Sequence, residues 1–235
     1  MIGFYDYTMV LTYLSLLSAT TGIVVSLSGG GHPYLGCLFL LVCGLCDAFD
    51  GKVARTKKDR TRMEQNFGIQ IDSLSDIVAF GVLPACIGAA LIRVSPVLRV
   101  LFNGGDFKPA MALKLGLHAV LVLYVLAALI RLAYFNVTEQ ERQETEGGVR
   151  KYYVGLPVTS AALIFPFVLL LQYVLPMDIT LVYIGVVVLT GFLFLFKFQV
   201  RKPGLRGLLL MVAVGAVEFA LRPRSRTSIR MTCSS

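Results

Sequence analysis

The chain has 235 residues, of which 56% are hydrophobic and only 15% are charged, and its mean hydropathy is +0.75. Soluble domains carry about 25% charged residues, so this composition excludes an ordinary water-soluble domain and predicts a protein that crosses the membrane several times. The formal net charge of +8 has two compatible explanations, basic cytoplasmic loops or attraction to an anionic lipid or substrate.

The apolar residues fall into segments that approach or exceed the length needed to span a bilayer. The first is not followed by a small-residue cleavage site, so we expect a retained helix and not a signal peptide. In the third segment, Pro84 is expected to kink the helix. The predicted fold class is all-α, a polytopic membrane helix bundle with six core transmembrane helices: residues 8–28, 34–55, 68–93, 109–136, 156–175 and 179–198.

The first segment contains several small and hydroxyl-bearing residues. They favour close packing against another helix, or they face a polar cavity, and the sequence leaves both interpretations open. These residues are Ser15, Ser18, Thr20, Thr21 and Gly22.

Three stretches between the apolar segments are predicted as loops, at residues 56–66, 94–108 and 138–151. The first is strongly basic, and basic residues also follow the sixth segment. Because Lys and Arg concentrate in cytoplasmic loops, we expect these two stretches, residues 138–151 and the N-terminus to be cytoplasmic. The cell membrane is therefore the expected location.

Residues 201–235 form a basic C-terminal segment, which we separate from a membrane domain at residues 1–200. Within it, residues 205–221 are apolar but short, so they form either a seventh span or an extra helix at the membrane interface.

Four aspartates adjoin or interrupt apolar segments, where unpaired charge is costly and marks a functional site. Asp47 and Asp50 are three residues apart, and Asp72 and Asp76 are four apart. On helices, each pair occupies one face. Two such faces opposed would bring four carboxylates together, and their mutual repulsion predicts a divalent metal.

Small and basic residues surround these aspartates. Gly51 and Ala54 leave room for a bulky ligand, and Gly68 clears a second surface one turn before Asp72. Arg55 can pair with phosphate through its forked guanidinium. The combination indicates phosphoryl or phosphatidyl transfer on a metal pair. Buried carboxylates also occur in ion pathways, so a cation transporter is the alternative from another class.

The same residues resemble the signature of the CDP-alcohol phosphotransferase family. The interval from Arg55 to Gly68 holds twelve residues, which is longer than is usual in the family, and Ser15 stands where an asparagine is expected. The matching positions are Asp47-x-x-Asp50-Gly51-x-x-Ala54-Arg55 and Gly68-x-x-x-Asp72-x-x-x-Asp76.

Three further stretches are similar to the integral-membrane phosphatidylserine synthases of that family. They are residues 71–85, Arg131-Leu-x-x-Phe135-Asn136 and Gly155-Leu-Pro157. This similarity implies CDP-diacylglycerol as donor and L-serine as acceptor, in a homodimer embedded in membrane lipid. The basic loops beside the aspartates predict that the active site lies at the cytoplasmic face. No nucleic-acid partner is expected.

The resemblance also implies roles for individual residues. Two divalent cations, Mg²⁺ or Mn²⁺, would be held by Asp47, Asp50, Asp72 and Asp76, and Asp76 would be the catalytic base on the serine hydroxyl. CDP-diacylglycerol would be bound by Asp47, Gly51, Ala54, Arg55 and Gly68.

For the serine carboxylate, Arg131 is a candidate because it is embedded near the end of the fourth predicted helix and offers a two-point fork. Asn136 would add a hydrogen bond if that helix end is unwound. The alternative interpretation is that Arg131 anchors the helix at the membrane surface and binds no substrate. Other acceptors stay open: glycerol phosphate, inositol phosphate, choline or ethanolamine. A phosphorylated acceptor would need a basic cluster, which Arg131 and the Arg150-Lys151 pair could form.

Overall fold

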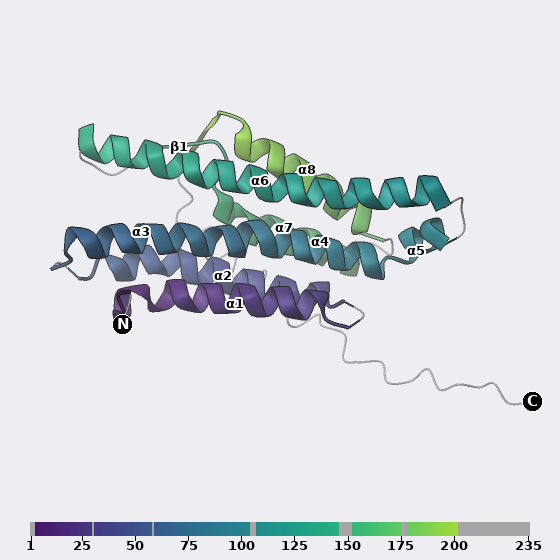
Figure 1. Ribbon diagram of the computed structural model, residues 1–235, viewed down its shortest axis with the longest axis horizontal. Helices are drawn as coiled ribbons and strands as arrows, with labels where there is room; N and C mark the ends of the chain where they lie inside the picture. The colour runs from purple at the N-terminus through teal and green to yellow at the C-terminus, as the bar shows by residue number, and fades with distance from the viewer. Residues whose placement is uncertain are drawn as a thin grey trace, which may run out of the picture.

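A computed structural model describes residues 3–29, 31–57, 59–103, 107–145, 152–174 and 178–201. The helices run side by side along the long axis of the molecule (Figure 1). In chain order the elements are η1 (Tyr7–Met9), α1 (Val10–Leu27), α2 (Pro33–Ala54), α3 (Arg62–Asp76), η2 (Ile77–Val82), α4 (Leu83–Val94), α5 (Pro96–Asn103), α6 (Phe107–Thr145), β1 (Tyr152–Val154), η3 (Val158–Ser160), α7 (Ala161–Val174), α8 (Thr180–Leu195) and β2 (Gln199–Arg201).

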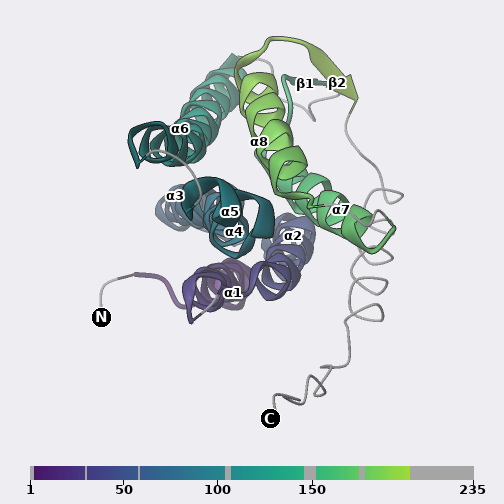
Figure 2. The same ribbon diagram turned by 90° about the vertical axis from the view of Figure 1, so that its right-hand side faces the viewer.

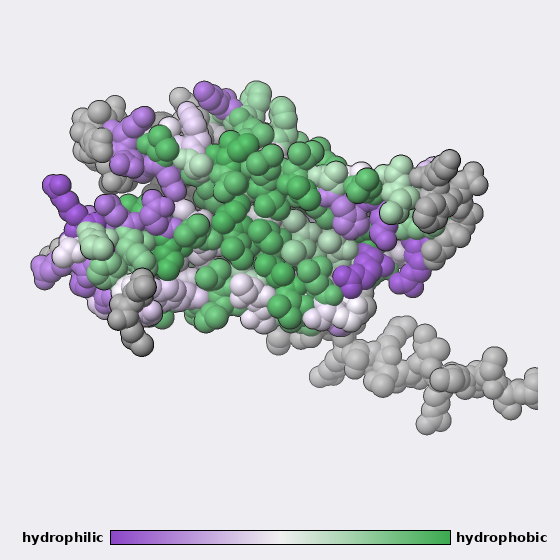
Figure 3. Space-filling model, viewed as in Figure 1, coloured by the Kyte–Doolittle hydropathy of each residue, from purple (hydrophilic) through white to green (hydrophobic). Residues whose placement is uncertain are grey.

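The predicted fold class, a membrane helix bundle, is confirmed. Four helical stretches are long and apolar enough to span a bilayer: Tyr7–Leu27, Pro33–Ala54, Arg62–Val94 and Pro109–Arg142. Two further apolar helices, Val158–Gln172 and Thr180–Leu195, are shorter. Hydrophobic residues form a broad band around the middle of the molecule, with hydrophilic residues at both ends (Figure 3).

Helix α4 lies at the centre of the bundle and packs against α1, α2, α6 and α8 (Figure 2). The residues that make this possible are small: Ala85, Gly88 and Ala90 are all buried. At Gly88, a β-carbon would lie 2.8 Å from Leu121 of α6, so glycine is what allows this close approach.

Helices α1 and α2 form the most extensively packed pair, and small residues at their interface explain this close packing. A β-carbon at Gly36 would lie 1.9 Å from the Ser26 hydroxyl, and one at Gly22 would lie 2.8 Å from Phe39. The Ser18 hydroxyl donates to the Phe39 carbonyl (3.1 Å). Of the two interpretations of the small residues in this segment, the structure therefore favours close helix packing.

A π-helical turn, η2, lies between α3 and α4, directly before the segment that contains Pro84. Pro84 has no N–H to donate to the carbonyl of Phe80, one turn earlier. The hydroxyl of Tyr124 on α6 donates to that carbonyl instead (2.7 Å), and the Tyr183 hydroxyl donates to the carbonyl of Pro84 itself (2.8 Å). Two buried tyrosines thus satisfy backbone groups inside the apolar core.

Replacing Tyr124 with Phe is expected to lower the free energy of unfolding by about 1–2 kcal/mol, because the buried Phe80 carbonyl loses this hydrogen bond. Thermal unfolding of the detergent-solubilised protein measures the change. Tyr134→Phe is the matched control, since Tyr134 lies on the same helix but is 44% exposed. Equal melting temperatures for Tyr124→Phe and the unmodified protein would contradict this account.

Three predicted boundaries are wrong. Residues 94–108 are not all loop, because Pro96–Asn103 form α5. Helix α3 begins at Arg62, well before residue 68, where Thr61 and Glu64 form a reciprocal capping box. Helix α6 continues without a break past Asn136 to Thr145, so the unwound helix end considered for Asn136 is not present.

The connection after α8 contains a strand that was not predicted from the sequence, because β2 pairs with β1 in an antiparallel ladder. Gly155, directly after β1, has a φ of +78° and donates its N–H to the Phe198 carbonyl. A β-carbon there would meet the Phe196 carbonyl oxygen at 3.1 Å, so this turn requires glycine for both conformation and space. Residues 146–151 and 202–235, including Arg150-Lys151 and the 205–221 segment, lie outside the described residues.

Candidate active site

Three of the four aspartates predicted to converge come together at the polar end of α2 and the adjoining part of α3. Asp47 and Asp50 lie on α2, and Asp72 lies on α3. One carboxylate oxygen from each comes within 4.8 Å of the others. All three side chains are partly buried, so water screens their repulsion only in part.

No described Lys or Arg forms an ion pair with any of these three carboxylates. The Asp50 carboxylate accepts a hydrogen bond from the N–H of Gly51, which leaves the net negative charge of the cluster unbalanced. Oxygen ligands crowded in this way suit a hard divalent cation such as Mg²⁺ or Mn²⁺. The residues present therefore fit a metal centre.

Asp76 lies one turn further along α3, at the boundary with the π-helical turn, and only 9% of it is exposed. It is near enough to Asp47 and Asp72 to interact with both electrostatically. Its neighbour Ser75 donates to the carbonyl of Thr12 on α1 (3.3 Å), which holds this part of α3 against α1. Asp76 is thus the deepest carboxylate of the four.

Gly51 and Arg55 lie as expected for a ligand surface. The space where a β-carbon of Gly51 would lie is open except for the Arg55 guanidinium, whose nitrogens are 3.9 and 4.0 Å away. Ala54, on the same last turn of α2, is partly buried. A cation therefore borders an uncovered stretch of backbone beside Asp50.

Gly68 is different from what was expected, because the surface above it is not clear. A β-carbon there would lie 2.8 Å from a guanidinium nitrogen of Arg60, so the glycine makes room for this arginine. Arg60 was not among the predicted site residues. It lies in the lengthened basic stretch between Arg55 and Gly68, and that departure from the family pattern is the sequence signal that could have identified it.

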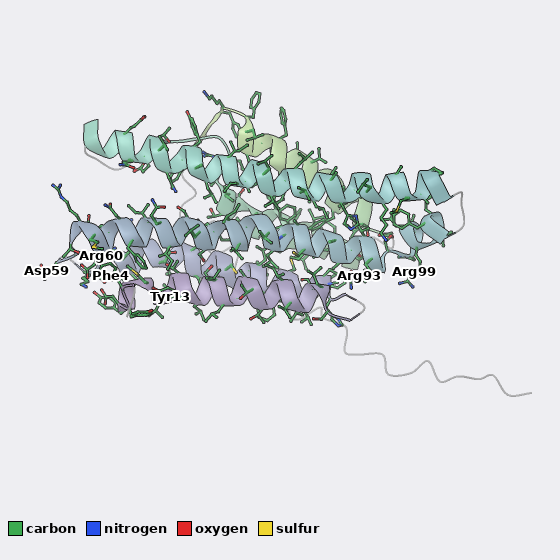
Figure 4. The ribbon with its side chains drawn as sticks, in the orientation of Figure 1. Phe4, Tyr13, Asp59, Arg60, Arg93 and Arg99 are labelled. Carbon is green, nitrogen blue, oxygen red and sulfur yellow. The ribbon has the colours of Figure 1, made fainter. Side chains whose placement is uncertain are left out.

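The N-terminal segment closes over the same end of the molecule (Figure 4). The Lys57 ammonium bridges Asp6 (2.6 Å) and Glu64 (3.3 Å), and Phe4 packs edge-on against Phe67. Hydrogen bonding between Lys57 and Asp6 lowers the pKa of the Asp6 carboxyl and raises the pKa of the Lys57 ammonium. The loop beside the aspartates is therefore fixed by charge as well as by aromatic packing.

Arg131 and Asn136 lie on α6, but they face different neighbours. Arg131 is 5% exposed and donates to the carbonyls of Leu156 (3.0 Å) and Gly155 (3.5 Å). The Asn136 amide donates to the hydroxyl of Ser73 (2.7 Å), the residue directly after Asp72. Asn136 thus connects α6 to α3, which carries Asp72 and Asp76. Arg131 holds the turn that precedes η3.

Comparison with known proteins agrees with this geometry. The sequence model of the family described as CDP-alcohol phosphatidyltransferase matches residues 7–197. The chain belongs to this family. The match covers Asp47, Asp50, Asp72 and Asp76, as well as Arg55, Gly68, Arg131 and Asn136.

The similar proteins are named as serine O-phosphatidyltransferases or as an archaetidylserine synthase. The chain is 32% identical over 163 residues to the CDP-diacylglycerol–serine O-phosphatidyltransferase of Saccharomyces cerevisiae, covering 68% of this chain and 51% of that protein. It is 37% identical over 150 residues to the archaetidylserine synthase of Methanothermobacter thermautotrophicus, covering 63% and 52%. It is 26% identical over 219 residues to the CDP-diacylglycerol–serine O-phosphatidyltransferase of Methanocaldococcus jannaschii, covering 89% and 85%.

The chain thus spans about half the length of the first two relatives and most of the length of the third. The resemblance stated from the sequence motif, to the CDP-alcohol phosphotransferases and among them to the phosphatidylserine synthases, is confirmed.

Proposed function

We propose that this protein transfers a phosphatidyl group from CDP-diacylglycerol to L-serine, giving phosphatidylserine and CMP. The observation that carries the proposal is the convergence of Asp47, Asp50 and Asp72 from two helices beside Gly51 and Arg55. The names of the similar proteins support the choice of donor and acceptor. Family membership favours group transfer over the cation-transporter alternative.

In this proposal the four aspartates hold two divalent cations, which, when bound, supply the charge that neutralises the donor diphosphate. Arg55 and Arg60 bind phosphate oxygens, and Gly51 and Ala54 leave room for the nucleotide. Asp76 accepts the proton of the serine hydroxyl. The serine oxygen then forms a bond to the phosphorus that carries diacylglycerol, the bond from that phosphorus to the CMP oxygen breaks, and CMP leaves.

An acceptor panel tests the proposal. The detergent-solubilised protein is supplied with CDP-diacylglycerol and Mg²⁺ or Mn²⁺, and CMP release is measured with each acceptor in turn. CMP should be released when serine is the acceptor. It should not be released with glycerol phosphate, inositol phosphate, choline or ethanolamine. Release with a phosphorylated acceptor but not with serine would overturn the serine assignment while keeping the transferase. No release with any acceptor would overturn the transferase.

The acceptor site is proposed to include Arg131 and Asn136. Asn136 is linked to Ser73, beside Asp72, so this face of α6 borders the aspartates. Arg131 is buried and already donates to two carbonyls, which fixes its guanidinium beside Gly155. A guanidinium carries five N–H donors in one plane, so in the proposal its donors other than those two bind the carboxylate of serine.

Replacing Arg131 with Lys is expected to raise the KM for serine about tenfold, because the charge remains but the two-point fork is lost. The KM for CDP-diacylglycerol should hardly change. Steady-state kinetics with each substrate varied separately make the measurement. An unchanged serine KM, or a parallel rise of both KM values, would show that Arg131 only anchors the helix and the Gly155 turn.

The proposal places the active site at the cytoplasmic face of the cell membrane. Basic residues at the aspartate end support this orientation, as cytoplasmic loops are rich in Lys and Arg. They include Lys52, Arg55, Lys57, Arg60 and Arg62. The proposal also keeps residues 1–200 as one membrane domain and 201–235 as a separate basic segment.

We propose a homodimer as the functional form. Membership of the CDP-alcohol phosphatidyltransferase family supports this form. Chemical cross-linking in native membranes tests the dimer, and a chain that cross-links only as a monomer would contradict it.

A further inference from the structure

A second polar site lies at the end of the bundle opposite the aspartates. A pocket of about 310 Å³ opens there between α4, α5 and α6. Four basic side chains line it: Arg93, Arg99, Lys114 and His118. Arg93 and Arg99 lie far from Arg60 and Asp59, which mark the aspartate end (Figure 4). Ile92 and Phe102 supply an apolar wall.

The cations of this pocket form no ion pairs with the acidic side chains that the structure describes. Lys57 and Arg142, elsewhere in the chain, both form ion pairs. Arg99 and Lys114 form none with any described acidic residue. The positive-inside rule accounts for basic residues at the aspartate end, but it gives no reason for three cations at the other end.

Arg93 gives the pocket a fixed wall. Its guanidinium donates to the carbonyls of Leu27 and Gly29 (both 3.1 Å), where α1 ends. Arg93 also lines the pocket, so backbone contacts hold one of the pocket's cations in place before any ligand binds. Preorganised charge of this kind lowers the cost of binding an anion.

Helix α5 adds an apolar surface next to the basic pocket. The Ser95 hydroxyl accepts from the N–H of Leu98 (3.1 Å) and so caps the helix, and Leu98 is buried. Val97, Val100 and Leu101, whose spacing places them on one face of α5, are 52%, 73% and 50% exposed. A short helix with one apolar face and a basic neighbour is typical of segments that lie in the membrane interface.

We propose that this pocket binds the phosphate headgroup of an anionic phospholipid, with the acyl chains against the exposed face of α5. The cations Arg93, Arg99 and Lys114 surround the position of the phosphate, and Arg can bind it in two-point fashion. A soluble phosphate would use the cations but not the adjacent apolar face. Figure 3 shows hydrophilic and hydrophobic residues side by side at this end of the molecule.

Native mass spectrometry of the full-length protein in detergent tests the proposal by counting bound lipids. The probes are a short-chain phosphatidylglycerol, a phosphatidylcholine of the same chain length and inorganic phosphate. The test variant is Arg99→Gln/Lys114→Gln. Its affinity for phosphatidylglycerol should fall about 25-fold, because each Lys or Arg near an anionic lipid contributes a factor of about five.

Arg142→Gln/Lys197→Gln is the matched control, because it removes the same charge at the aspartate end and should bind phosphatidylglycerol normally. The conservative Arg99→Lys/Lys114→Arg should also keep binding. A test variant that elutes and melts as the unmodified protein does but still binds phosphatidylglycerol with full affinity would overturn the proposal. Equal binding of phosphatidylcholine would overturn it too. Binding of phosphate that matches phosphatidylglycerol would assign the pocket to a small anion instead of a lipid.

Discussion

Replacing Asp47, Asp50 or Asp72 singly with Ala is expected to lower turnover by roughly 10³-fold or more. A bound divalent cation supplies several kcal/mol of charge stabilisation during group transfer, and each 1.4 kcal/mol corresponds to a factor of ten in rate. The three carboxylates lie within 4.8 Å of one another, so the loss of one disrupts the set. CMP release from CDP-diacylglycerol measures the effect.

The same site predicts metal dependence. Excess EDTA should abolish CMP release, and Mg²⁺ or Mn²⁺ should restore it. Asp59→Ala is the matched control, because Asp59 is an exposed carboxylate in the loop at the same end of the molecule (Figure 4). Full activity in EDTA, or an equal loss in Asp59→Ala, would contradict the proposed metal centre.

The melting temperature distinguishes loss of the metal site from misfolding of the aspartate variants. Without metal, three neighbouring carboxylates repel one another, so removing one charge relieves the folded state. In EDTA, Asp50→Ala should therefore melt at a temperature equal to or higher than that of the unmodified protein. A much lower melting temperature would show that the aspartate is needed for folding, and the loss of turnover would then say little about metal.

Replacing Asp76 with Asn is expected to lower kcat by roughly 10²–10⁴-fold, which is the usual contribution of a general base. The loss should lie at the upper end of this range or beyond it, because in the proposal Asp76 also holds a cation. Asn has nearly the same shape but cannot take up a proton at neutral pH. The affinity for CDP-diacylglycerol should change less than kcat, because Asp47, Asp50 and Asp72 remain to hold the cations that neutralise the donor diphosphate.

Single-turnover CMP release and donor binding, measured separately, distinguish these effects. Ser75→Ala is the control, since it removes the hydrogen bond that holds α3 to Thr12 and leaves the carboxylate in place. It should lower the melting temperature slightly and keep turnover within a few-fold. Near-normal kcat in Asp76→Asn with an intact fold would remove Asp76 from the role of base.

The sequence determined much of this architecture because its signals are local. Long uncharged runs must be helical to satisfy their backbone in a bilayer, so the apolar segments and the fold class could be read directly. The pairing of Asp47 with Asp50 on one helix face follows from the helical period alone. The family motif is likewise a pattern of short spacings on single helices.

Helix ends outside the membrane were harder to predict from the sequence, because hydropathy marks where the bilayer ends and not where the helix ends. Helix α6 continues through a polar stretch in which Arg142 and Glu139 pair across one turn (2.6 Å). The start of α3 was encoded locally by Thr61 and Glu64, a signal that the prediction of a polar loop overlooked.

Only the tertiary structure decided which distant groups meet. Asp72 joins Asp47 and Asp50 because α2 and α3 meet at one end of the bundle. Arg60 covers Gly68, and Arg131 holds the Gly155 turn, through contacts set by packing between separate segments. The basic pocket combines residues of α4, α5 and α6 that no local pattern relates. Spacing along one helix fixes a face, but which faces oppose each other depends on how helices from different parts of the chain pack.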